Sequence, residues 1–284
     1  MKIPKYWAKE IQSVTNPDGR AFALTCWQWS DVSQTEAAQR AKTRIQDVAT
    51  KVQRNETLQR YTYGKRPMRE EIIQAIQSRN GKEIGIVTRN GYGALVVNAA
   101  NAMFIDIDFE RKSPTGLLKG LMNKLLGKKS VSQEEQQVAQ IELWAQTRPD
   151  LGIRVYRTFA GLRCLITNEV FAPTDAGALA ILRDLNSDPL YITLCKQQEC
   201  FRARLTPKPW RCNISTPPAR YPFENQQVLS RYRQWERTYS ANASQFTTCR
   251  FIKHIGRNQV HPEVQPILDF HDQRACGNPQ LGLA

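Results

Sequence analysis

The chain has 284 residues, 41% of them hydrophobic and 23% charged, a composition typical of folded globular proteins rather than disordered ones. Its formal net charge of +14 favours a partner that carries phosphate, such as nucleic acid, a nucleotide or an anionic lipid surface. The sequence contains no run of 18 apolar residues, which argues against a transmembrane segment.

The cysteine pattern and the first residues bear on the cellular compartment. Seven cysteines are scattered without a C-x-x-C pair, and their number is odd. This pattern predicts reduced thiols rather than a disulfide framework or a structural zinc site. The first residues have no apolar signal-peptide core, so we expect a cytoplasmic protein.

The N-terminal region predicts a strand followed by two helices. Residues 20–29 are rich in aromatic side chains and predict a strand, and the spacing of apolar residues over 38–52 predicts a helix after it. The basic and aromatic segment 60–66 could stack on bases, although packing onto the core is the preferred interpretation. Pro67 is expected to begin a second helix, with Ile72 and Ile76 in its buried stripe.

The middle of the chain predicts a hairpin and an amphipathic insertion. Two strands, 83–88 and 92–98, are expected to flank a turn at Asn90-Gly91, followed by a buried strand over 103–109. Leucines and lysines alternate in 114–129 with helical spacing. This basic helix could contact a membrane surface or nucleic acid, but packing on its own domain is preferred.

The elements from 103 to 206 follow the order β-α-β-β-α-β. A helix over 131–147, strands over 152–158 and 162–167, a helix over 174–185 and a strand over 199–206 complete the series. This order predicts an α+β fold with a ferredoxin-like (RRM-like) core. The first and third strands should be central, with the fourth beside the first, and the N-terminal hairpin and helices are candidates to cover the open face.

Prolines near 217–222 separate two predicted parts of the chain. Residues 1–216 should form the α+β core domain, and 217–284 a mainly helical extension packed on it. The extension should hold helices over 224–243 and 262–274 with a strand over 247–255. Its three histidines, His254, His261 and His271, have no metal-ligand spacing, and structural roles are preferred for them.

The predicted strand 103–109 carries the candidate site. Asp106 and Asp108 are two residues apart, so both should point to one face of the strand, while Ile105 and Ile107 point to the other. Neighbouring carboxylates repel unless a cation compensates them. The sequence therefore predicts a positively charged group facing this pair.

Arginines on the neighbouring predicted strands are the expected counterpart. Strand alternation places Arg163, Arg202 and Arg204 on the face that carries the two aspartates, with Lys208 and Arg211 just beyond. In one interpretation the aspartates hold a divalent cation while the basic residues bind phosphates. In the other the arginines neutralise the aspartates and no metal binds, since two carboxylates alone make a sparse magnesium site.

The stretch Phe104-Ile105-Asp106-Ile107-Asp108 resembles the first motif of the archaeo-eukaryotic primase-polymerase superfamily, in which Asp-x-Asp on an apolar strand binds metal. Residues 158–163 resemble its second motif, with Arg163 where that family has histidine. Residues 201–204 stand where the third motif supplies another acid, and have arginines instead. The segments Ile3–Trp7 and Cys200–Cys212 also resemble a bacterial family of unknown function.

The resemblance implies a nucleic-acid-associated protein in which Asp106 and Asp108 are catalytic and hold Mg²⁺ or Mn²⁺ during nucleotidyl or phosphoryl transfer. The basic residues would then bind a triphosphate or the phosphate backbone of a template. Two alternatives stay open. One is a non-catalytic module that binds nucleic acid or an acidic partner while the aspartates pair with arginines. The other is a metal-dependent nuclease that uses the same acids.

Overall fold

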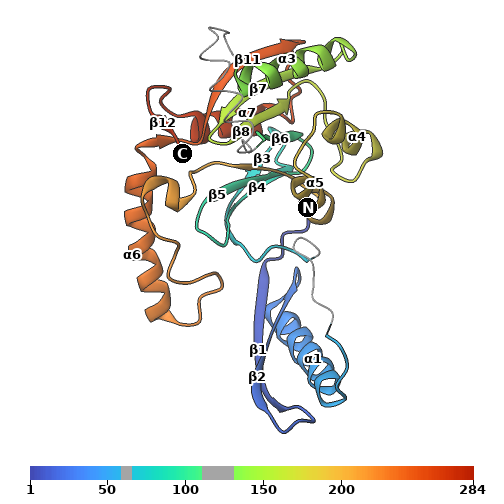
Figure 1. The fold of residues 1–284 in the computed structure, drawn as a ribbon, viewed down its shortest axis with the longest axis vertical. Helices are drawn as coiled ribbons and strands as arrows, with labels where there is room; N and C mark the ends of the chain where they lie inside the picture. The colour runs from blue at the N-terminus through green and yellow to red at the C-terminus, as the bar shows by residue number, and fades with distance from the viewer. Residues whose placement is uncertain (59–65, 111–130) are drawn as a thin grey trace, which may run out of the picture.

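The computed structural model describes residues 1–58, 66–110 and 131–284, so the segment 60–66, apart from Arg66, and the basic segment 114–129 fall outside the described residues. The architecture is mixed α+β with several antiparallel sheets: a small N-terminal lobe stands below a larger body (Figure 1). None of the described helices is long and apolar enough to span a bilayer.

The N-terminal lobe consists of a long hairpin and one helix. Strands β1 (Tyr6–Thr15) and β2 (Ala21–Ser30) pair antiparallel, and α1 (Gln34–Gln53) packs along them (Figure 1). Ser33 caps α1 by accepting a hydrogen bond from the Glu36 amide. The predicted strand and helix are confirmed, and β1 is an additional strand that pairs with the predicted one.

The first sheet of the body has the strand order β3-β4-β5-β9, formed by Glu71–Gln77, Glu83–Arg89, Leu95–Ala99 and Phe201–Arg204. The predicted hairpin is confirmed as β4 and β5. The helix predicted from Pro67 is wrong, because its isoleucines lie in β3 and pair with β4. Isoleucine favours extended backbone, and the Asn80-Gly81 turn, with Gly81 at φ +80°, returns the chain directly into β4.

The second sheet has the order β11-β7-β8-β6, formed by Cys249–Gly256, Gly152–Thr158, Gly161–Ile166 and Phe104–Asp108. Its apolar face shares one hydrophobic core with α3 (Gln133–Gln146) and α4 (Ala176–Asp184), which confirms both predicted helices. A capping box between Ser132 and Glu135 begins α3.

The predicted position of the fourth core strand is wrong. Strand β9 pairs with β5 in the other sheet, with Ala203 opposite Val97, and forms no ladder with β6. Helix α5 (Pro189–Gln198), in the segment between the predicted helix 174–185 and the predicted strand 199–206, lies at the junction. Its Tyr191 hydroxyl donates to the Phe104 carbonyl at 2.8 Å and accepts from the Arg202 amide at 3.3 Å. One side chain therefore bridges the facing edges of the two sheets.

The C-terminal segment completes the body. Helix α6 (Gln226–Ala243) runs beside the first sheet, and Arg233 pairs with Glu71 of β3 at 2.9 Å (Figure 1). The remaining elements are η1 (Pro209–Cys212), the short parallel pair β10 (Phe246–Thr247) and β12 (Gly282–Leu283), α7 (Gln265–His271) and the π-helical η2 (Asp272–Cys276).

The open face of the second sheet is covered by α7 and η2, not by the N-terminal elements as expected. The buried His271 ring lies 5.0 Å from the ring of Phe104 and 5.0 Å from that of Tyr156. Because Phe104 shares its face with Asp106, the C-terminal segment reaches the face that carries the predicted site.

Candidate functional site

The acidic residues lie at the end of the edge strand β6. Asp106 is half-buried and Asp108 is exposed, while Ile105 and Ile107 are buried in the core, so the predicted alternation is confirmed. Gly161 of β8 lies opposite Asp108, and a Cβ at this position would stand 2.0 Å from the Ile107 carbonyl oxygen. The two strands can approach this closely only because residue 161 has no side chain.

A third carboxylate, which sequence reasoning missed, joins the pair. The Asp188 amide donates to the Asp106 carbonyl at 3.0 Å, and the Asp188 side chain caps α5 by accepting from the Leu190 amide. The pKa of Asp108 is raised, first by partial burial and then by repulsion from Asp106 and Asp188. The Asp-Pro pair does signal a helix start, but nothing in the sequence places that helix beside β6.

Arg163 is the cross-strand partner of Asp106, as the alternation predicts. Its Nε lies 3.8 Å from Asp106 Oδ1, and its Nη1 donates to the Arg204 carbonyl at 2.9 Å. The side chain is 3% exposed, and Nε has no hydrogen-bond partner among the described residues. Arg163 therefore offers Asp106 only a long ion pair.

Arg202 is engaged by a carboxylate that sequence reasoning did not consider. Its Nη2 donates to both carboxylate oxygens of Glu70, at 2.8 and 2.9 Å, and the Glu70 side chain is 2% exposed. Thr88 also donates to Glu70, at 2.5 Å. The Arg202 guanidinium, expected to bind phosphate, is instead largely neutralised inside the protein, because the chain before β3 passes beside β9.

The remaining predicted basic residues form no ion pair within 4 Å among the described residues, although Asp106 and Asp108 act on them at longer range. Burial lowers the pKa of Arg204, Lys208 and Arg211, and neighbouring cations lower it further: Arg163 beside Arg204, and Arg204 beside the other two. The Nε of Arg204 is buried without a hydrogen-bond partner among the described residues. Such a group of cations attracts an anion.

Aromatic rings support two of these cations. Lys208 Nζ lies 5.5 Å from the centre of the Trp210 ring, and the Arg211 guanidinium lies 4.1 Å from that of Phe159. Both rings are about half exposed. Lys208 and Arg211 also interact electrostatically with Asp108, so the basic group lies near enough to the acidic strand end for the two charges to act on each other.

A cavity of about 300 Å³ is lined by four of the predicted site residues, drawn from both sheets, whereas Asp108, Lys208 and Arg211 are not among its lining residues. It is lined by Asp106 and Arg163 from the second sheet, by Arg202 and Arg204 from β9, and by Arg220 from the loop before α6. Although β9 belongs to the other sheet, its arginines therefore face the acidic strand. We call this the junction cavity.

The junction cavity is adjacent to a second, tryptophan-lined cavity, since both are lined by Met68, Gly91 and Arg220. The second cavity, of about 220 Å³, is also lined by Trp7, Trp27, Trp29 and Arg69. The Arg69 guanidinium lies 4.0 Å from the centre of the Trp27 ring. We call these four residues the tryptophan surface. Its signal in the sequence is the W-x-W spacing of Trp27 and Trp29, which puts both rings on one face of a strand.

The protein was compared with protein-family models, with curated proteins and with solved structures, and none of them matches.

Proposed function

We propose that this protein binds nucleic acid or nucleotides, with phosphates held by Arg204 of the junction cavity together with Lys208 and Arg211, and bases stacked on the tryptophan surface. The observation that carries this proposal is the group of cations Arg204, Lys208 and Arg211, which have no ion pair among the described residues and lie near the acidic end of β6, in a chain of net charge +14. Basic grooves interleaved with aromatic rings suit single-stranded nucleic acid, because every base can stack.

We further propose that the site performs metal-dependent nucleotidyl or phosphoryl transfer, as the likeness to primase-polymerases implies. Asp106, Asp108 and Asp188 would hold Mg²⁺ or Mn²⁺. The raised pKa of Asp108 supports this, because carboxylates that repel one another gain most from a bound divalent cation. When bound, the metal would neutralise charge on the reacting phosphate. Asp188 would supply the third acid that residues 201–204 lack.

In this site the residues of the chain have separate tasks. Arg204, Lys208 and Arg211 would bind and orient the phosphates by charge-assisted hydrogen bonds. Arg163, buried behind Asp106, would fix the orientation of that carboxylate through its cross-strand contact. Arg202 would act structurally, through its ion pair with Glu70.

A second candidate is the non-catalytic binding module, which could also take an acidic partner. The contact of 3.8 Å between Arg163 and Asp106 favours it, because an arginine then fills part of the role of a metal. Under this candidate the cations and the tryptophan surface still bind the ligand, and the aspartates only orient arginines.

Thermal unfolding with Mn²⁺ and a nucleoside triphosphate tests the catalytic candidate. A ligand present at a hundredfold excess over its Kd stabilises the folded state by about 2.7 kcal/mol. We expect Asp108→Asn to lose the Mn²⁺-dependent part of this stabilisation, and Asp184→Asn, an exposed position on α4, to keep it. A Mn²⁺ response that survives in Asp108→Asn would contradict metal binding at this site.

Asp106→Asn separates the two candidates. If the site is catalytic, transfer of a labelled nucleotide to an oligonucleotide stops while the unfolding curve changes little. If Asp106 serves only to pair with Arg163, the variant unfolds at lower denaturant because the buried guanidinium loses its carboxylate. Labelled oligonucleotide binding, followed by fluorescence anisotropy, should persist in both cases.

A further inference from the structure

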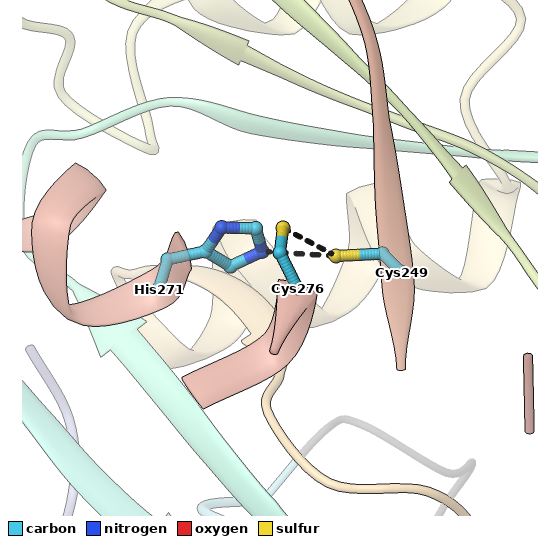
Figure 2. Close-up of side chains that lie close together, drawn as sticks. All are labelled: Cys249, His271 and Cys276. Carbon is cyan, nitrogen blue, oxygen red and sulfur yellow. Dashed lines mark hydrogen bonds between the residues drawn. The ribbon is translucent and has the colours of Figure 1, made fainter. Parts of the chain in front are cut away.

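Three potential metal ligands meet behind the junction cavity. Cys249 begins β11, His271 ends α7 and Cys276 ends η2, and their ligand atoms all lie within 4.8 Å of one another (Figure 2). Cys249 and His271 are fully buried, and Cys276 is half-buried. The sequence spacing of 22 and 27 residues from Cys249 gives no metal motif, so only the fold brings the three together.

The distances suit a tetrahedral ion. Cys249 Sγ lies 3.6 Å from Cys276 Sγ and 3.8 Å from His271 Nε2. Zinc binds thiolate sulfur at about 2.3 Å and imidazole nitrogen at about 2.0 Å, which separates neighbouring ligands of a tetrahedron by roughly 3.5 to 3.8 Å. The two separations that involve Cys249 therefore match such a site, and the third, between Cys276 Sγ and the His271 ring nitrogen, is within 4.8 Å.

The imidazole is oriented as in known zinc sites. His271 Nδ1 lies 2.9 Å from Asp272 Oδ1, which also accepts from the Tyr156 hydroxyl at 2.8 Å. Arg154 donates to the other oxygen of Asp272 at 2.8 Å. A carboxylate accepts rather than donates, so the proton is placed on Nδ1 and the lone pair of Nε2 points toward the thiols. A carboxylate behind the ligating histidine is the usual outer partner of protein-bound zinc.

We infer that Cys249, His271 and Cys276 form a binding site for a thiophilic divalent cation, with zinc as the cation that this donor set favours. Of the described residues only these three form the group, so a water molecule would complete the coordination. Arg163 Nη1 lies 3.2 Å from His271 Nε2. The ion would replace that hydrogen bond, while Arg163 keeps its contacts with the Arg204 carbonyl and Asp106.

A redox pair of the two cysteines explains the structure less well. A redox pair would account for the short distance between the Cys249 and Cys276 sulfurs. It would not explain why Asp272 orients the His271 imidazole toward those sulfurs. The metal site accounts for all three residues and for the network behind them.

Cobalt substitution tests the site in the full chain. The reduced protein, stripped with a chelator and titrated with Co²⁺, should bind one ion per chain with visible d–d bands of tetrahedral intensity and a thiolate-to-cobalt charge-transfer band. Zinc should then displace the cobalt and abolish both signals. A wild-type titration without the charge-transfer band overturns the proposal, whatever the variants do.

Variants assign the ligands. Cys276→Ser, at the half-buried position, and His271→Gln should lose the charge-transfer intensity or the tetrahedral bands, whereas Cys26→Ser, on β2 of the N-terminal lobe, should match the wild type. Asp272→Asn should weaken binding about 10- to 100-fold without removing the bands, since Asp272 is a positioning residue. Wild-type spectra in Cys276→Ser, or a Cys249–Cys276 disulfide in a metal-free native protein by mass spectrometry, would refute the site.

Discussion

Asp106 and Arg163 face each other directly across β6 and β8, yet the shortest contact between their charged groups is 3.8 Å. Arg163 also donates to the Arg204 carbonyl and lies within hydrogen-bond distance of His271, and both contacts compete with its interaction with Asp106. The arginine that strand alternation predicts as the partner of Asp106 therefore compensates it only in part. This leaves the acidic end of β6 able to respond to a further cation.

Asp108→Asn should stabilise the protein slightly in the absence of metal and make its stability less dependent on pH. The pKa of Asp108 is raised, so between about pH 4, where the unfolded carboxyl titrates, and the higher folded pKa, the folded state binds more protons. Wild-type stability then falls as pH rises through this window, and the variant should lack that decrease. Because Asp108 is exposed, the gain should be about 0.5 kcal/mol or less, measured by urea unfolding across pH.

A wild-type stability that rises with pH in the same window, relative to the variant, would contradict the repulsion among Asp106, Asp108 and Asp188. Asp184→Asn is the matched control, because it removes an exposed carboxylate outside the acidic strand end.

Breaking the buried ion pair between Glu70 and Arg202 should change the free energy of unfolding much more than Asp108→Asn does. Glu70→Ala leaves the Arg202 guanidinium without its carboxylate, and we expect a loss of about 3 kcal/mol in the free energy of unfolding. The double variant Glu70→Ala, Arg202→Met should recover part of this loss, since it removes the unpaired charge. Equal stability of Glu70→Ala and the wild type in urea would show that Arg202 is free for another partner.

Gly161→Ala should disturb the acidic strand end. The added methyl group would meet the Ile107 carbonyl at 2.0 Å, so β6 and β8 must separate, at about 3 kcal/mol. Gly282→Ala is the control, because its Cβ would meet only the Phe246 ring, at 3.9 Å. Chemical denaturation measures both, and similar values for the two variants would contradict the close approach of the strands.

Lys208→Gln should weaken binding of a labelled oligonucleotide uniformly across sequences and reduce the slope of log affinity against log salt by about 1. The reason is the loss of one phosphate contact at the basic group. Lys42→Gln, an exposed position on α1 outside the cavities described above, should leave the slope unchanged. A slope unaffected by Lys208→Gln would place the phosphates elsewhere.

Trp27→Ala should weaken single-strand binding by about 5- to 150-fold, which corresponds to the 1–3 kcal/mol of one base stacked on an aromatic ring. Trp27→Phe retains a ring for stacking and should recover most of the affinity. Fluorescence anisotropy with a labelled oligonucleotide measures both. Equal losses in the two variants would indicate that the tryptophan packs the lobe against Arg69 rather than contacting a ligand.

The local elements were largely determined by the sequence itself. Alternation along β6 placed Asp106 and Asp108 on one face, the Asn90-Gly91 turn predicted the hairpin, and apolar spacing predicted α1, α3 and α4. These features depend on neighbours within a few residues, whose side-chain directions follow from backbone geometry alone. The prediction of a helix over the β3 segment is wrong because its few isoleucines fit both the helical period of 3.6 residues and the strand period of two.

Only the tertiary structure decided which edges meet. Four features of the site join residues that are distant in sequence. They are the pairing of β9 with β5, the proximity of Asp188 to Asp108, the ion pair of Arg202 with Glu70, and the cluster of Cys249, His271 and Cys276. Such contacts are set by how whole layers pack their apolar faces, a property of the entire chain that no local pattern encodes. The sequence by itself thus determined an acidic strand in a basic protein, and the packing of two sheets through Tyr191 decided what faces it.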